Sequence, residues 1–439
     1  MNYAEALAYL DEHINLERVT GNAPKQPPTL ERMARLMSVI GDPQHAYPVV
    51  HITGTNGKGS TAQIVTRLLM AHGLTVGTIT SPHLERVNER LSIDAVPITD
   101  DEFGEAIGAI ADLEALAGVR PSYFEVITAA AYRWFADQAV DVAVVEVGMF
   151  GRWDSTNVAD ARVAVVTNVG VDHLDYLATT REEARAAIAY EKAGIVKPDC
   201  TLVLGETDPE LAQIFKREGP ALTIERDIDF AVTQNSLALG GRLLDIRTPQ
   251  ASYAEVFLPL HGAHQGDNAV LAITAVEAFF DAPIDPEVLE TALAEVEWPG
   301  RLEVLGHQPL VVLDGAHNPA GAEVAMQALD DEFDVAGERI MVVGILQPHD
   351  PAELLDIFRV EDTKRVIACT PNWPRAIPAR EIANIAESMG ADATAVDDVR
   401  RACDRALAEA GPDDIVIVTG SLYTVGAARA HLIGRLHRR

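Results

Sequence analysis

Apolar residues in the first part of the chain follow a strand–helix–strand order that is broken by glycines. Residues 49–53 are short, apolar and largely β-branched, and Gly54 ends them. Residues 60–71 then carry apolar side chains at helical spacing, and residues 74–80 have the pattern of a second strand. This order predicts the beginning of a mainly parallel α/β sheet.

The same alternation continues through the next part of the chain. Strands are predicted at 142–147 and 163–168, and helices at 124–137, 180–194 and 266–280. Thr180 with Glu183 three residues later is a capping box for the helix at 180–194. Between about 222 and 260 the pattern changes to short alternating segments (230–232, 243–246 and 253–258), which predict a small antiparallel β patch.

A linker is predicted at residues 298–300, because Pro299 and Gly300 both interrupt regular structure. Beyond it, strands are expected at 310–313, 340–345, 365–369 and 415–419, and helices at 321–329, 378–389, 399–410 and 423–436. About 140 residues of this alternation predict a second, doubly wound α/β region.

Composition and charge narrow the range of partners. Of the 439 residues 48% are apolar, which is enough for a large core, and the net charge is −31. So acidic a surface repels nucleic acid and anionic lipid, and neither is expected as a partner. Residues 1–20 lack the apolar segment of a signal peptide and no 18-residue apolar run occurs, so a cytoplasmic protein is expected. Three widely spaced cysteines indicate free thiols.

A phosphate-binding loop is predicted between the first strand and helix. Glycines let successive backbone N–H groups point at one phosphate, and the helix N-terminus adds its positive end. Lysine is scarce in this chain, with six residues among 35 basic ones, so a lysine inside this loop is informative. The nucleotide-binding candidates are Thr55, Asn56, Gly57, Lys58, Gly59, Ser60 and Thr61. A solvent-facing glycine turn is the alternative.

Polar residues stand at the ends of three further predicted strands, where ligands bind in α/β folds. Glu146 ends an otherwise apolar strand, and a carboxylate there is costly without a cation, which favours Mg²⁺ over a structural role. Ser81 lies in a Ser-Pro-His turn and His173 follows Asp172. Taken alone, these two are more typical of an ordinary turn and of a structural histidine.

Two helix ends carry candidates that their own patterns explain in structural terms. The segment Ser122-Tyr123-Phe124-Glu125 opens a predicted helix, and by itself it is more typical of a simple N-terminal cap with an aromatic residue packed inward. Lys192 lies near a helix C-terminus, where the helix dipole favours a cation.

Several strings together resemble the folylpolyglutamate synthase branch of the Mur-ligase superfamily. They are GTNGKGS at 54–60, SPHL at 81–84, EKAGI at 191–195, PGR at 299–301 and DGAHNP at 314–319. Gly59 after the lysine is similar to the folate branch, since the peptidoglycan ligases usually have threonine there. The resemblance runs from about Gly54 to Tyr423, whereas the first 45 residues match only at 15–18 (NLER).

The resemblance implies a fold, a nucleotide site and a metal site. Residues 1–298 are expected to form an ATP-binding domain of the phosphate-loop type with the β patch, and 299–439 a Rossmann-like glutamate-ligase domain. Two Mg²⁺ ions are implied, with Ser81, Glu146 and His173 as ligands. Lys192 is implied to be carbamylated, and the counterparts of Asn268, Arg301 and Asp314 contact ATP.

The resemblance also implies residues for the other substrates. The segment Ser122, Tyr123, Phe124 and Glu125 corresponds to the pterin site, and Arg152, Trp153 and Asp154 lie in a substrate loop. Phe150 stands where the family usually has the second of three glycines. His317 is expected either to assist the transfer or to cap a helix.

The implied reaction joins L-glutamate to a folate carboxylate, or to dihydropteroate, through an acyl phosphate made from ATP by a monomer. Lys58, Glu146, His173, Lys192 and Arg301 would be its catalytic residues. A Mur-type ligase acting on a cell-wall precursor, a dinucleotide-dependent dehydrogenase and a non-catalytic nucleotide-binding module are the alternatives. No GxGxxG follows a predicted strand in the C-terminal region, which counts against the dehydrogenase.

Overall fold

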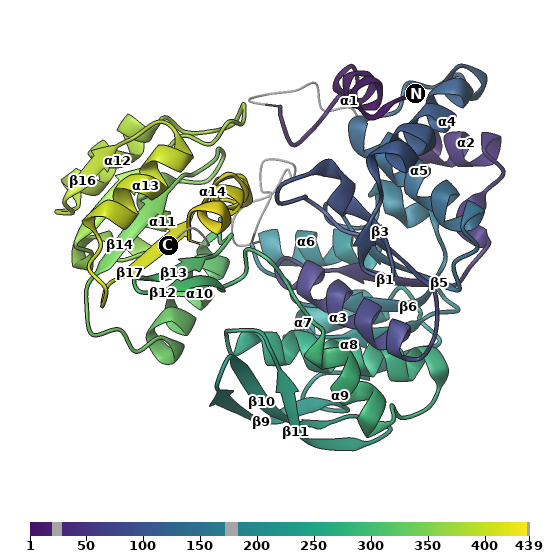
Figure 1. The fold of residues 1–439 in the computed structure, drawn as a ribbon. Helices are drawn as coiled ribbons and strands as arrows, with labels where there is room; N and C mark the ends of the chain where they lie inside the picture. Colours follow the sequence, from purple (N-terminus) through teal and green to yellow (C-terminus); the bar gives the residue numbers. More distant parts are fainter. Residues whose placement is uncertain (20–28, 172–182, 437–439) are drawn as a thin grey trace.

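The computed structural model describes residues 1–19, 29–171 and 183–436, which form three β-sheets with helices around them (Figure 1). The strands before Trp298 make up two of the sheets and the strands after it make up the third. Figure 1 shows the third sheet and its helices to one side of the other two. The α/β fold class predicted from the sequence is confirmed.

The largest sheet has eight strands in the order β4-β3-β2-β5-β1-β6-β7-β8. Its parallel strands are β1 (Val49–Thr53), β2 (Val76–Ile79), β5 (Val142–Glu146), β6 (Ala161–Val166), β7 (Thr201–Leu204) and β8 (Leu222–Glu225). Two short antiparallel strands, β3 (Leu91–Ile93) and β4 (Val96–Pro97), extend one edge. β1 is central, so the loop after it lies at the middle of the sheet's carboxyl edge.

Helices bury the apolar strands of this sheet on both faces. α3 (Lys58–Ala71), α8 (His264–Phe280) and α9 (Pro286–Ala294) pack on one face. The other face is covered by α1 (Tyr3–Asp11), α2 (Glu31–Val39), α4 (Asp100–Ala117), α5 (Tyr123–Asp137), α6 (Ala184–Ala193) and α7 (Pro209–Lys216). The predicted capping residue Thr180 of α6 lies outside the described residues.

The predicted β patch is a three-stranded antiparallel sheet that packs on α8 and α9. Its strands are β9 (Ala231–Ala238), β10 (Gly241–Arg247) and β11 (Ser252–Leu258), in the order β11-β10-β9. The predicted lower limit of the patch was wrong, because Leu222–Glu225 pairs in parallel with β7 as the edge of the large sheet.

The third sheet has the order β12-β13-β17-β14-β15-β16, with only β12 antiparallel. Its strands are β12 (Glu303–His307), β13 (Leu310–Leu313), β14 (Arg339–Val343), β15 (Arg365–Ala368), β16 (Ala393–Ala395) and β17 (Ile415–Thr419). Its helices are α10 (Pro319–Glu332), α11 (Pro351–Ile357), α12 (Ala379–Ser388), α13 (Val399–Glu409) and α14 (Leu422–Leu436). They lie in two layers, with one apolar core on each face of the sheet.

Short 3-10 turns complete the described elements, at Pro43–His45, Val87–Arg90, Ser155–Val158 and Val360–Asp362. All three cysteines are buried free thiols. Within the described ranges, no helix is both long and apolar enough to span a membrane.

Candidate active site

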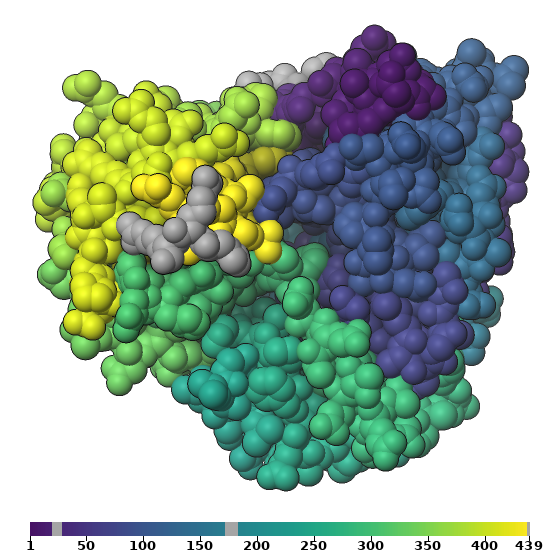
Figure 2. All heavy atoms as spheres, in the orientation of Figure 1, coloured from purple at the N-terminus to yellow at the C-terminus, as the bar shows by residue number. Residues whose placement is uncertain are grey.

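A cavity of about 2530 Å³ lies where the carboxyl ends of the large sheet face the third sheet. Residues of the loop after β1 line it on one side, and Arg301, Asp314 and His317 line it on the other. In Figure 2 blue residues of the large-sheet unit lie beside yellow residues of the third-sheet unit near the centre of the view. The cavity is large enough for a nucleotide together with a second, extended substrate.

The loop after β1 has the geometry of a phosphate-binding loop. Gly57 has a φ of 84°, which glycine adopts without strain, and α3 begins at the next residue. The Nζ atom of Lys58 donates to the carbonyl oxygens of Gly54 at 3.1 Å and Thr55 at 3.2 Å. Lys58 therefore folds back over its own loop, at the positive end of α3, where a phosphate would bind.

Gly59 has a packing reason to be glycine, because a Cβ there would lie 2.6 Å from Cζ2 of Trp298. Trp298 belongs to the linker between the two large sheets. We expect Gly59→Ala to push this indole aside, lowering the unfolding free energy by about 1–3 kcal/mol and weakening nucleotide binding. Thermal unfolding and nucleotide titration measure both effects.

The control for this prediction is Gly59→Ala combined with Trp298→Ala, which opens space for the new methyl group. If the methyl destabilises the protein equally with and without the indole, the explanation by Trp298 is wrong.

Glu146, at the end of β5, is a buried carboxylate beside the Ser81 turn. The backbone N–H of Ser81 donates to its Oε2 atom at 3.0 Å. Burial raises the pKa of Glu146, and Lys58, this N–H and Arg301 oppose the rise. The structure thus brings together two of the three predicted metal ligands at one wall of the cavity.

The Glu146 and Ser81 oxygens fit Mg²⁺, which prefers oxygen ligands. Among the described residues no group of three or more His, Cys, Asp or Glu could hold a metal. Mg²⁺ needs fewer protein ligands, since it usually keeps several waters and takes phosphate oxygens from the substrate. The third predicted ligand, His173, lies outside the described residues.

Arg301 and Asp314 form the opposite wall. Asp314 directly follows β13, and the N–H groups of Leu302 and Ala316 donate to its two carboxylate oxygens at 3.0 Å and 2.8 Å. Burial lowers the pKa of Arg301, while Asp314 and Glu146 raise it. Arg301 therefore interacts with carboxylates from both sides of the cleft, and Glu146 interacts with both Arg301 and Lys58.

Two asparagines join the phosphate loop to the third sheet. The Nδ2 atom of Asn318 donates to Oδ1 of Asn56 at 3.1 Å, and the reverse bond is 3.4 Å. Asn318 also caps α10 by accepting from the N–H of Gly321. On α8, Asn268 lies against the loop, because its Oδ1 would be 2.3 Å from a Cβ at Gly57. The role of Asn318 was missed, since sequence gives only its position in a motif.

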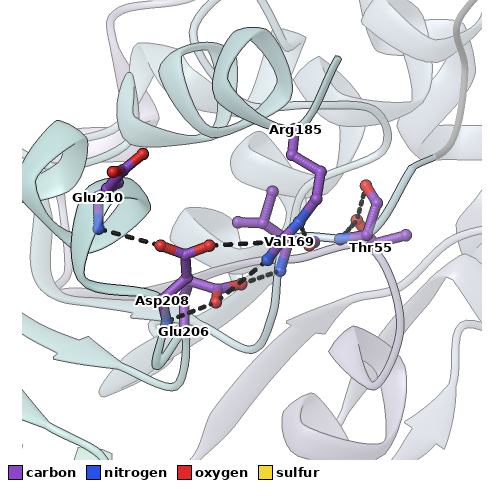
Figure 3. Close-up of polar contacts among 7 residues, drawn as sticks. Thr55, Val169, Arg185, Glu206, Asp208 and Glu210 are labelled. Atoms are coloured by element: carbon purple, nitrogen blue, oxygen red, sulfur yellow. Dashed lines mark hydrogen bonds and ion pairs between the residues drawn. The ribbon is translucent and has the colours of Figure 1, made fainter. Parts of the chain in front are cut away.

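The beginning of the phosphate loop, at Thr55, is held by hydrogen bonds to the loop after β6, as Figure 3 shows. The Thr55 hydroxyl donates to the Gly170 carbonyl and accepts from the Gly170 N–H. The neighbouring Val169 N–H donates to the Glu206 carboxylate at 2.9 Å, and Arg185 ties that carboxylate to α6. Sequence reasoning did not find Glu206, because Val169 and Arg185, which connect it to the loop and to α6, are 37 and 21 residues away.

Lys192 on α6 lies beneath the phosphate loop. It is buried, and its Nζ atom donates to the Gly54 carbonyl at 2.7 Å. Gly54 therefore receives bonds from both Lys58 and Lys192. The two lysines of the GTNGKGS and EKAGI motifs meet at one backbone oxygen.

The segment at the start of α5 forms the helix cap expected from its pattern. Ser122 and Glu125 make a reciprocal capping box, and Nε of Arg32 donates to both Glu125 oxygens at 3.0 Å and 2.8 Å. Phe124 lies against Gly148, where a Cβ would be 2.6 Å from its ring. Ser122, Phe124 and Glu125 line the cavity, so a capping role and a place in the site coexist.

The loop after β5 sends its side chains in different directions. Trp153 is 44% exposed and lines the cavity. Asp154 is buried and accepts from the Met149 and Thr156 N–H groups, so it fixes the loop. The Arg152 guanidinium instead pairs with Glu218 and donates to the Tyr190 carbonyl. Four predicted site residues are not among the described residues that line the cavity, namely Thr61, Tyr123, Arg152 and Lys192.

Phe150 occupies a backbone conformation that suits glycine, with a φ of 60°. We expect Phe150→Gly to relieve this strain, which by itself raises the free energy of unfolding by about 1 kcal/mol. The lost packing of the partly buried ring lowers the free energy of unfolding. Measuring unfolding together with Phe150→Ala separates the two terms, because alanine loses the ring without gaining glycine's freedom. Equal stability of the glycine and alanine variants would contradict the strain.

Two family profiles together match most of the chain. The Mur ligase middle domain matches residues 52–276, and the Mur ligase glutamate ligase domain matches residues 300–422. These profiles define an ATP-dependent ligase of the Mur type, in agreement with the phosphate loop and with the cleft between the sheets.

Relatives specify the branch. A Mycobacterium tuberculosis protein named dihydrofolate synthase/folylpolyglutamate synthase is 39% identical, with 93% of this chain and 90% of that protein covered. The structure of Mycobacterium tuberculosis folylpolyglutamate synthase complexed with ADP has a TM-score of 0.90 at 36% identity, covering 98% of both chains. A bifunctional folylpolyglutamate synthase/dihydrofolate synthase with Mn, AMPPNP and L-glutamate bound has a TM-score of 0.84 at 28% identity, covering 100% of this chain and 98% of that one. The chain belongs to the folylpolyglutamate synthase/dihydrofolate synthase family.

Proposed function

We propose that this protein is an ATP-dependent ligase that joins L-glutamate to a folate carboxylate, and that it also acts on dihydropteroate. The observation that carries the proposal is one cavity lined by Lys58, Glu146 and Ser81 from the large sheet and by Arg301 and Asp314 from the third. Membership of the family supports the choice of substrates. The Mur-type alternative has no support among the relatives, which are folate ligases.

In the first step the γ-phosphoryl group passes from ATP to a carboxylate oxygen of the acceptor, giving ADP and an acyl phosphate. The loop N–H groups and the α3 N-terminus would hold the phosphates, and Lys58 and Arg301 would offset the charge on the transferring group. Glu146 and Ser81 would hold Mg²⁺, which supplies charge neutralisation at the phosphate oxygens. Asp314 would contact the nucleotide from the third sheet.

In the second step the glutamate amine attacks the acyl carbonyl carbon, loses a proton, and inorganic phosphate leaves as the amide forms. His317 is suited to stand near this step, because it lines the cavity and its Nδ1 is fixed by the Gly315 carbonyl at 2.9 Å. The cleft between the sheets would keep water from the acyl phosphate, which otherwise hydrolyses.

The remaining site assignments are proposals with different degrees of support. Asn268 is supported by its contact with Gly57, and Phe124 and Trp153 by their place in the cavity wall. His173 as a ligand of a second Mg²⁺ rests on the family motif alone. Arg152 has the weakest case as a substrate contact, since Glu218 pairs with its guanidinium.

Carbamylation of Lys192 is proposed from the family resemblance and is compatible with its buried place under the phosphate loop. A carbamate would change the ammonium into an anion beside the phosphate loop. Intact mass measured without acid treatment should show an added mass of CO₂, about 44 Da by composition, which Lys192→Arg removes. An unmodified mass under bicarbonate would refute the carbamate.

We also propose two domains, residues 1–298 and 299–439, in a cytoplasmic monomer that binds neither nucleic acid nor membranes. The division is supported by the absence of strand pairing across Trp298 among the described residues. The net charge of −31 supports the lack of polyanionic partners.

The function is tested by ADP release with tetrahydrofolate or dihydropteroate as acceptor, each with and without glutamate, and by mass spectrometry of the product. We expect ADP and amide in equal amounts, and only when acceptor and glutamate are both present. A dual enzyme uses both acceptors. ADP release that is indifferent to both substrates would refute the proposal and favour a simple nucleotide-binding module or ATPase.

A further inference from the structure

Glu17, in the segment after α1, contacts both halves of the molecule. Nη1 and Nη2 of Arg90 donate to its two carboxylate oxygens at 2.8 Å and 2.7 Å. From the third-sheet side, the Tyr423 hydroxyl donates to the same carboxylate at 3.1 Å, and Nε1 of Trp373 donates to the Glu17 carbonyl at 3.0 Å. Figure 1 shows this segment extending from α1 toward the third-sheet unit.

Of the partners of Glu17, Arg90 is buried, and Trp373 and Tyr423 are half-buried. The Arg90 side chain is fully buried, and Trp373 and Tyr423 stack with ring centroids 3.9 Å apart. A buried guanidinium needs a compensating charge, and removal of its partner leaves that charge unpaired. The Glu17 carboxylate balances the charge of Arg90, and one of the two stacked rings of the third-sheet unit, Tyr423, donates its hydroxyl to it.

Arg90 in turn holds the turn that carries Ser81. Its Nε atom donates to Nδ1 of His83 at 2.9 Å, and its carbonyl accepts from the Thr80 N–H at 3.1 Å. Arg90 is thus hydrogen-bonded to residues on both sides of Ser81, and the Ser81 N–H donates to the Glu146 carboxylate.

We infer that Glu17 is a positioning residue that couples docking of the third-sheet unit to the geometry of the Ser81–Glu146 metal site. Building on the proposed function, the chain of contacts runs from Tyr423 through Glu17 and Arg90 to His83 and Ser81. When the third-sheet unit docks, Tyr423 and Trp373 complete the Glu17 site and Arg90 fixes the turn. The metal site is then completed only when the unit that brings Arg301 and Asp314 is in place.

Two conservative variants break the coupling at different points. Glu17→Gln keeps the shape but removes the charge opposite Arg90, and Tyr423→Phe removes only the hydroxyl while keeping the stack on Trp373. Arg242→Gln is the control, because Arg242 pairs with Glu332 across the same two units at 2.8 Å but neither residue lines the cavity.

The first readout is the Mg²⁺ concentration that half-saturates binding of a non-hydrolysable ATP analogue. We expect Glu17→Gln to raise it about tenfold, as for the loss of other groups that orient metal ligands, and Tyr423→Phe to raise it less. The double variant should be no worse than Glu17→Gln alone, since both act through one carboxylate. Arg242→Gln should leave the Mg²⁺ requirement unchanged and should combine additively with Glu17→Gln.

The second readout is the distance between spin labels on the two units, at Leu239→Cys and Glu387→Cys, in a chain whose native cysteines are buried. We expect the nucleotide analogue with Mg²⁺ to narrow the distance distribution in the unmutated background and in Arg242→Gln, but less in Glu17→Gln. An unchanged Mg²⁺ requirement in Glu17→Gln, or equal effects of Glu17→Gln and Arg242→Gln, would overturn the inference. Neither readout needs turnover. A failure of glutamate-dependent ADP release would therefore refute the proposed function, whereas the inference about Glu17 is decided by the two binding and distance measurements alone.

Discussion

Replacing Lys58 by methionine is expected to lower kcat by about 10²–10³-fold, as for other groups that stabilise charge in a transition state. Lys58 is held over the phosphate loop by the Gly54 and Thr55 carbonyls, at the N-terminus of α3. Methionine keeps the apolar length of the side chain and removes only the cation. Steady-state rates of ADP release with saturating substrates measure the effect.

The matched control is Lys216→Met, which removes a lysine that pairs with Glu225. That residue does not line the cavity, so kcat should stay near the unmutated value. A fall of similar size in both variants would show that the loss comes from charge or stability rather than from the phosphate loop. A Lys58→Met enzyme with normal kcat would contradict the assignment directly.

Glu146→Gln is expected to lower Mg²⁺-dependent activity by a comparable factor, about 10²-fold or more. The amide has the size of the carboxylate and can still accept from the Ser81 N–H, so the fold should persist. Removing a buried charge should even leave the melting temperature unchanged or higher. Thermal unfolding of the variant, measured beside its Mg²⁺ titration, separates loss of metal from loss of structure.

The pH dependence of Mg²⁺ binding gives a second test of Glu146. Burial raises the pKa of this carboxyl above its ordinary value. Mg²⁺ binds the ionised form, so the affinity should be highest above the raised pKa and should fall as the pH drops through it. In Glu146→Gln this part of the pH dependence should vanish. A variant that keeps the full pH profile would show that another group titrates.

The sequence predicted the parts of the site that are continuous in the chain. The phosphate loop, the end of β5 and the DGAHNP turn each combine a strand end with glycine or polar residues, and local pattern is enough to place them. The sequence also indicated an N-terminal cap at the start of α5, which the structure contains as a capping box of Ser122 and Glu125. Such features depend on neighbours a few residues away.

Features that depend on distant partners could not be predicted. Glu17 is hydrogen-bonded to Trp373, 356 residues away in the sequence, and to Tyr423, 406 residues away, and no local pattern predicts either contact. Arg152 turns to Glu218 instead of lining the cavity for the same reason. In the third-sheet unit, the edge strands β12 and β16 and the short helix α11 were not predicted, since three to seven residues carry too little periodicity.

The transfer of oxygen from the acceptor carboxylate to phosphate tests the account most directly. The folate acceptor is prepared with ¹⁸O in the reacting carboxylate and turned over with ATP, Mg²⁺ and glutamate. An acyl phosphate formed in the cleft between the two large sheets requires ¹⁸O to leave in inorganic phosphate, with ADP as the nucleotide product. Release of unlabelled phosphate, or of label in AMP, would contradict it.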